Sequence, residues 1–142
     1  MRRSLPVSAA LVILIGTEAL VGFWAQLAPR AFYDHFPGFG VWVAGDGPYN
    51  EHLIRDVGGL HLGLTLLCVL ALWAPRLVSP RAVGGATLAY GAPHLAYHLT
   101  HLASVPVRAD QVSSVAGLVM AVAVSAALLW PTAAPRDPRS VP

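Results

Sequence analysis

The sequence predicts an all-α integral membrane protein, built as a bundle of four transmembrane helices. Composition is the first observation: the 142-residue chain is 56% hydrophobic and only 11% charged. Soluble domains carry about 25% charged residues. The second observation is a set of four apolar stretches, each close to the roughly 20 residues that cross the hydrocarbon core of a bilayer. We therefore expect one membrane domain over residues 1–130.

Each of the four predicted spans ends shortly before a proline, which cannot donate the backbone hydrogen bond that a continuing helix needs. The spans cover residues 5–28, 49–74, 81–103 and 111–130. Glu18 interrupts the first apolar run, which is also longer than the core of a signal peptide, so we expect it to be retained as a span. Residues 131–142 are rich in proline and arginine and have no apolar period, so we expect a disordered cytoplasmic tail.

The arginines set the predicted orientation. Six of the nine lie on one side of a four-span arrangement: Arg2, Arg3, Arg76, Arg81, Arg136 and Arg139. The opposite side carries only Arg30 and Arg108. Because arginine and lysine are in excess on the cytoplasmic side, both termini are expected in the cytoplasm. The arginines are also scattered and the net charge is only +2, which excludes the clustered basic face of a nucleic-acid-binding protein.

The one long connection, residues 29–48, lies on the extracytoplasmic side and reads PRAFYDHFPGFGVWVAGDGP. Its five large aromatic side chains are Phe32, Tyr33, Phe36, Phe39 and Trp42. We expect this segment to cover the outer end of the bundle. Connections of this length are often lids or binding loops, whereas aromatic rings also anchor a segment at the lipid headgroups, and both interpretations stay open.

Ionisable residues at membrane depth indicate where a functional site lies. Such residues are costly to bury and usually face the interior of the bundle. Five of the six histidines lie in the second and third spans: His52, His61, His94, His98 and His101. At 1.5 Å per residue, Glu18, His61 and His94 all lie roughly 13–16 Å from the outer ends of their spans. The sequence therefore predicts a polar pocket in the outer leaflet, between the first three spans.

The spacing of His94, His98 and His101, i, i+4 and i+7, places them on one stripe of a helix. Imidazole is a common ligand of transition metals and haem, so these residues, with His52 and His61, are the predicted metal ligands. The alternative is that the histidines form hydrogen bonds between helices and bind no cofactor.

The charged residues of the pocket have separate expected roles. Glu18 is the predicted deep proton carrier, and Asp56 can orient His52 by accepting a hydrogen bond from one ring nitrogen. Arg55 can pair with Glu51 or hold an anionic headgroup, since it is charged at every relevant pH. Glu18, Arg55 and Asp56 are therefore the predicted catalytic residues, if the protein is an enzyme.

Three functions remain open from these residues. One is redox chemistry on a lipophilic substrate such as a quinone or a lipid. Another is a non-enzymatic scaffold or accessory subunit, as a homo-oligomer or with a membrane partner. The third is a proton or cation transporter, although the inner half of the second span, residues 64–74, offers only Thr65 and Cys68 as polar groups. That gap favours a one-sided pocket over a path through the membrane.

A short stretch also carries a family resemblance. Residues 55–64, RDVGGLHLGL, open the second span, and Ala28-Pro29 closes the first. Both resemble small four-helix membrane proteins of the broad DoxX-like type. The resemblance implies a multi-pass protein of the bacterial plasma membrane, and no catalytic residue carries over from it.

Overall fold

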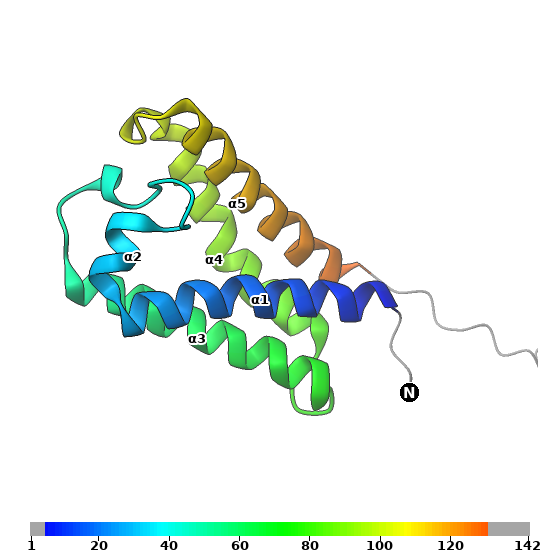
Figure 1. Cartoon of the computed structure of the whole chain (residues 1–142). Helices are drawn as coiled ribbons and strands as arrows, with labels where there is room; N and C mark the ends of the chain where they lie inside the picture. The colour runs from blue at the N-terminus through cyan, green and yellow to red at the C-terminus, as the bar shows by residue number, and fades with distance from the viewer. Residues whose placement is uncertain (1–4, 131–142) are drawn as a thin grey trace, which may run out of the picture.

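The computed structural model describes residues 5–130, and these confirm the all-α prediction. Four long helices make up the bundle: α1 (Leu5–Leu27), α3 (Glu51–Trp73), α4 (Pro80–Thr100) and α5 (Arg108–Leu129). Successive long helices run in opposite directions, so the start of α1 and the end of α5 lie at the same end of the bundle (Figure 1). The predicted tail, residues 131–142, lies outside the described residues.

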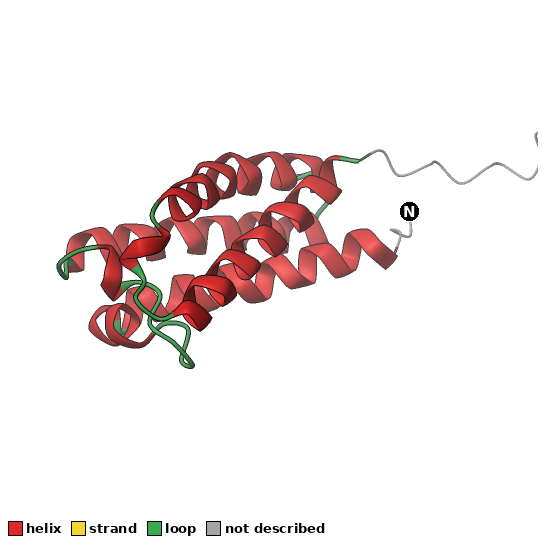
Figure 2. Ribbon diagram, turned by 90° about the horizontal axis from the view of Figure 1, so that it is seen from above, coloured by secondary structure: helices red, strands yellow, loops and turns green. Residues whose placement is uncertain are grey.

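The bundle is organised as two tightly packed pairs, α1 with α3 and α4 with α5, and the pairs cross each other (Figures 1 and 2). Glycines allow the close approach within each pair. A Cβ atom at Gly22 of α1 would lie 3.0 Å from Leu62 of α3. A Cβ atom at Gly84 of α4 would lie only 2.7 Å from the carbonyl oxygen of Ser125 in α5. Any larger side chain at Gly84 therefore has to push the two helices apart.

The surface of the long helices is apolar, as expected for a protein surrounded by lipid. Leu20 and Phe23 of α1, Leu66 of α3 and Val112 of α5 all point outward and are more than half exposed. Three helices, α1, α3 and α5, are long and apolar enough to cross a membrane. The chain therefore has the character of a membrane-embedded protein. The third predicted span, residues 81–103, corresponds to α4, which is not among these three helices. Four crossings and their orientation therefore stay predictions.

A buried apolar cluster fills the end of the bundle where α1 starts and α5 ends. All four long helices contribute to it: Leu11, Leu14, Cys68, Ala71, Val83 and Leu128. This cluster occupies the half of the bundle that the sequence predicts to face the cytoplasm.

The aromatic segment contains a helix that the sequence analysis did not predict, α2 (Pro29–His35). Pro29 was interpreted only as the end of the first span. Proline is equally suited to the first turn of a new helix, because its missing N–H is not needed there. The chain thus leaves α1 at Ala28 and starts α2 at the next residue.

The third predicted span ends earlier than expected. Helix α4 stops at Thr100 rather than residue 103, and a short 3-10 turn, Leu102–Ser104, follows.

The segment between α1 and α3 lies across one end of the bundle and is bonded to both sides of it. Trp24 of α1 packs edge-on against Phe36, with ring centroids 5.8 Å apart. On the far side, the backbone N–H of Val41 donates to Asp110 of α5 at 3.2 Å. The Ser104 hydroxyl donates to Asp46 of the 3-10 turn Ala44–Asp46 at 2.7 Å. These contacts make the segment a cover for this end.

Candidate functional site

Three polar side chains from three helices meet in the interior of the bundle. Glu18 of α1 and His61 of α3 are only 7% and 8% exposed. His61 Nδ1 lies 2.5 Å from Glu18 Oε2. His61 Nε2 lies 3.2 Å from the hydroxyl oxygen of Tyr90 on α4. We refer to these residues as the Glu18–His61–Tyr90 triad.

Glu18 and His61 meet because each occupies the buried stripe of its own helix. On α3 the stripe runs through Ile54, Gly58, His61 and Leu64, at the three- and four-residue spacing of one helical face. On α1, Glu18 likewise lies within the buried stripe, between Leu14 and Gly22. Because both faces are otherwise apolar, each of these two side chains finds its polar partner in the other. The sequence prediction that they lie at the same depth is consistent with this contact.

The hydrogen bonds of the triad allow a proton to move without breaking them. When Glu18 is a carboxylate, His61 Nδ1–H donates to it, and in the neutral imidazole Nε2 accepts from the Tyr90 hydroxyl. In the imidazolium form Nε2 donates to the tyrosine oxygen instead, because the hydroxyl group can rotate. The added proton can instead lie on Glu18, which then donates to Nδ1, while the imidazole carries its N–H on Nε2 and donates to the tyrosine oxygen. The site can therefore bind and release one proton in the same geometry.

The predicted histidine stripe forms a line of rings that continues from the triad. The His94 ring stacks on the Tyr90 ring at a centroid distance of 5.2 Å, and the His98 ring meets His94 edge-on at 4.7 Å. His101 joins this line only through Tyr97, whose ring meets His98 edge-on at 5.6 Å and stacks on the His101 ring at 4.1 Å. His101 ends α4, and its ring lies 2.9 Å from the carbonyl oxygen of Tyr97. The line of rings runs from the interior toward the end covered by the aromatic segment.

His52 and Asp56 are placed away from the triad. The predicted contact between them exists, with His52 Nε2 3.4 Å from Asp56 Oδ2. The side chain of His52 is 88% exposed, and Asp56 is also mostly exposed. The reason is helical phase: His52 is half a turn away from His61, so it points out of the bundle. The structure therefore does not bring these two predicted site residues into the buried site.

Arg55 lies at the end of the α1–α3 pair, also outside the triad. Its Nε donates to Glu51 at 2.8 Å, which matches the predicted charge pair. Its Nη1 donates to the carbonyl oxygen of Gln26, while the Gln26 side chain donates to the carbonyl oxygen of Arg55 at 2.7 Å. Arg55 is thus a clamp between the end of α1 and the start of α3.

The geometry gives no support to the predicted metal site. Within residues 5–130, no group of three or more histidine, cysteine, aspartate or glutamate side chains is placed to hold a metal ion. Both ring nitrogens of His61 already have partners, and His94 contacts its neighbours through ring faces and edges. Binding of a metal or haem therefore stays a prediction.

Tyr90 is the residue of the triad that the sequence analysis missed. The signal was present, because Tyr90 lies four residues before His94 and so extends the same stripe toward the interior. The predicted site residues were all histidines or charged side chains, so Tyr90 was not among them. A tyrosine hydroxyl can complete a buried imidazole equally well, since it both donates and accepts.

Comparison with known proteins adds no assignment: no family model, no curated protein and no solved structure matches this chain. The resemblance to DoxX-like proteins accordingly remains a prediction. What the protein does has to be inferred from the triad and its surroundings.

Proposed function

We propose that this chain is a four-span membrane protein whose Glu18–His61–Tyr90 triad takes up and releases a proton. The observation that carries the proposal is the 2.5 Å contact between the buried Glu18 and His61. Histidine is the side chain whose charge ordinarily changes between about pH 5 and pH 8. A carboxyl group in direct contact with it, away from water, makes a site where one proton is shared.

A purely structural role explains this pair less well. Burying a carboxyl–imidazole pair costs desolvation, and well-packed apolar residues of similar volume are often equally stable or more stable. Polar residues inside membrane domains mark proton relays and substrate sites for this reason. The second partner of His61, the Tyr90 hydroxyl, keeps the imidazole satisfied in either protonation state.

The surroundings of the triad favour exchange from one side only. The apolar cluster of Leu11, Leu14, Cys68, Ala71, Val83 and Leu128 separates the triad from the end where α1 starts. In the other direction, the His94 and His98 rings supply the next titratable groups. We propose that protons enter along these rings from the end that carries the aromatic segment. A path through the membrane would need polar groups in the apolar cluster as well.

A one-sided proton site suits a membrane protein that reacts with, or senses, a molecule dissolved in the same leaflet. A quinone or another lipophilic proton carrier reaches such a site without leaving the bilayer. We therefore propose proton transfer to a lipophilic substrate as the chemistry of the triad, with Glu18 as the proton carrier. In this proposal His52, Arg55, Asp56 and His101 have no part in the proton step.

Glu18→Gln tests the proton site in the purified protein. We expect infrared difference spectra between two pH values to show a carboxyl band that this variant removes. Glu51→Gln is the matched control, because Glu51 lies at the exposed start of α3 and its loss leaves the Glu18 band in place. A spectrum in which the Glu18 contribution does not change with pH would support the scaffold interpretation. A proton flux across liposomes that depends on Glu18 would replace the one-sided site with a transporter.

Membrane orientation is tested by cysteine labelling in a Cys68→Ala background. We propose that α4 crosses the membrane like the other long helices and that both termini of the chain lie in the cytoplasm. An impermeant thiol reagent is then expected to label His35→Cys in intact cells, because α2 lies outside. Leu77→Cys, in the exposed turn between α3 and α4, is expected to react only after the membrane is permeabilised. The opposite pattern would invert the orientation.

A further inference from the structure

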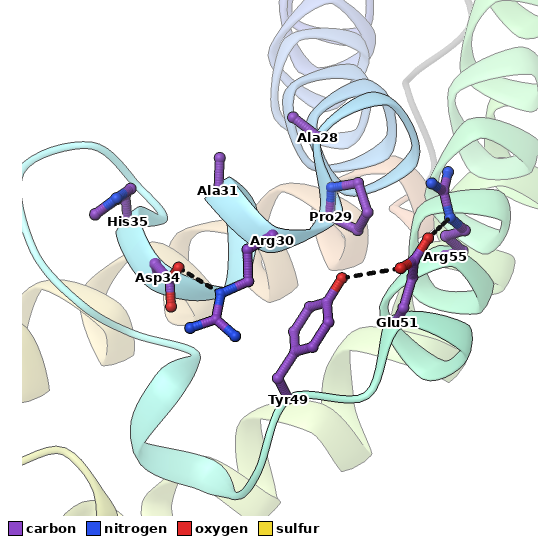
Figure 3. A pocket seen from close by; sticks show the side chains of 9 residues that line it. All are labelled: Ala28, Pro29, Arg30, Ala31, Asp34, His35, Tyr49, Glu51 and Arg55. Carbon is purple, nitrogen blue, oxygen red and sulfur yellow. Dashed lines mark hydrogen bonds and ion pairs between the residues drawn. The ribbon is translucent and has the colours of Figure 1, made fainter.

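An open hollow lies at the end of the α1–α3 pair, apart from the triad. It has a volume of about 580 Å³. Its lining comes from Ala28, α2, the start of α3 and the segment between these helices, and includes Arg30, Asp34, Tyr49, Glu51 and Arg55 (Figure 3). We call this the polar hollow. Since α1 and α3 are long and apolar enough to cross a membrane, a hollow at their common end lies at the boundary between lipid and water.

Two arginines with unused donors flank the polar hollow. Arg30 Nε donates to Asp34 at 2.7 Å, and Arg55 Nε donates to Glu51 at 2.8 Å. Each carboxylate thus engages its guanidinium through Nε. The terminal amino groups of Arg30 and the Nη2 group of Arg55 make no hydrogen bond to any residue that the structure describes. Both side chains are well exposed, so these groups are available to a ligand.

Tyr49 lies between the two arginines and contacts Arg30 on one side and Glu51, the partner of Arg55, on the other. Its ring lies under the Arg30 guanidinium, 5.0 Å from the Arg30 Cζ atom to the ring centroid. Its hydroxyl lies 3.4 Å from Glu51 Oε2, as Figure 3 shows. Desolvation, followed by the neighbouring Glu51 carboxylate, raises the pKa of Tyr49, so the hydroxyl stays protonated and donates. The positive and negative groups around the hollow are therefore fixed relative to each other.

A second hollow of similar volume lies along α1 and is apolar. Its lining residues are Gly16, Ala19, Leu20, Phe23, Trp24 and Leu27. We call this the apolar groove. It extends over eleven helical steps, about 16 Å at 1.5 Å per residue, which is the length scale of a lipid tail within one leaflet. It ends at Leu27, and the next residue, Ala28, lines the polar hollow.

We propose that the polar hollow and the apolar groove bind one phospholipid with a zwitterionic headgroup. The headgroup phosphate accepts hydrogen bonds from the free amino groups of Arg30 and Arg55. Its ammonium group faces the carboxylates of Asp34 and Glu51, and one acyl chain lies along α1 in the apolar groove. A headgroup with a phosphate and no cation would place its charge next to two carboxylates without compensation. The site is independent of the proton triad.

Lipid retention by the purified full-length protein tests the headgroup. After reconstitution with equal amounts of phosphatidylethanolamine and phosphatidylglycerol, we expect native mass spectrometry to find one retained phosphatidylethanolamine. The Arg30→Gln/Arg55→Gln variant is expected to retain less phosphatidylethanolamine, by about tenfold or more, since two charge-assisted hydrogen bonds are lost. Arg76→Gln, at the opposite end of the bundle, is the matched control and is expected to keep the lipid.

A second variant separates a lipid from a soluble phosphate ester. Gly16 lines the apolar groove, and a Cβ atom added there meets no atom within 4 Å, so Gly16→Leu is the substitution chosen to fill the groove. We expect this variant to lose the phospholipid while the polar hollow is unchanged. Equal retention of phosphatidylglycerol, retention unaffected by either variant, or full competition by glycerophosphoethanolamine without acyl chains would each overturn the proposal.

Discussion

His61→Ala should lower the free energy of unfolding by roughly 3–5 kcal/mol, because it leaves the Glu18 carboxyl group buried without its partner. The measurement is thermal or denaturant-induced unfolding of the protein in detergent, followed by circular dichroism. His52→Ala is the matched control, because the same substitution on the same helix removes an exposed ring. We expect that control to change stability by no more than about 0.5 kcal/mol.

The double variant Glu18→Leu/His61→Leu distinguishes the cost of an unpaired carboxyl group from the loss of a ring from the core. Replacing both members of a buried polar pair by apolar residues of similar volume is often neutral or stabilising. The double variant should therefore be clearly more stable than His61→Ala. If His61→Ala unfolds at the same temperature or denaturant concentration as the wild type, the buried pair is absent from the protein in detergent.

Gly84→Ala should destabilise the protein by about 1–3 kcal/mol, because one added methyl group overfills the contact between α4 and α5. The added Cβ would lie 2.7 Å from the carbonyl oxygen of Ser125 and 2.8 Å from Leu128 Cβ. Neither atom can give way by a rotamer change, so the helices have to separate.

Gly85→Ala is the matched control for this contact. A Cβ atom at Gly85 meets nothing within 4 Å, and alanine is intrinsically favoured over glycine in a helix by about 1 kcal/mol. We expect this neighbour to be neutral or slightly stabilised in the same unfolding experiment. Equal effects of the two substitutions would mean that α4 and α5 are not packed as described.

Much of the site follows from helix geometry that can be calculated from the sequence. The fixed rise of a helix predicts that Glu18 and His61 lie at a similar depth, and its fixed turn places His52 on the opposite side of α3 from His61. Placing His52 in the same pocket as His61 conflicts with that second consequence. The structure shows that phase, more than depth, decides which polar residues reach the interior.

Other features depend on contacts that spacing does not specify. Residues His94, His98 and His101 share a stripe, but metal binding requires their nitrogen lone pairs to converge on one point. In the structure the rings of His94 and His98 meet edge-on, and His101 turns back to cap the end of α4. Helix α2 was missed for a similar reason, because Pro29 both ends one helix and begins the next.

The proton site at Glu18, His61 and Tyr90 is the central claim, and its sidedness can be measured directly. The measurement is the infrared titration of Glu18 in sealed vesicles of known protein orientation, with the pH changed on one side at a time. We predict that the carboxyl band removed by Glu18→Gln follows the pH on the side of the aromatic segment and ignores the pH on the other side. A band that follows the side of the α3–α4 turn, or a pH response that persists in Glu18→Gln, would contradict this account.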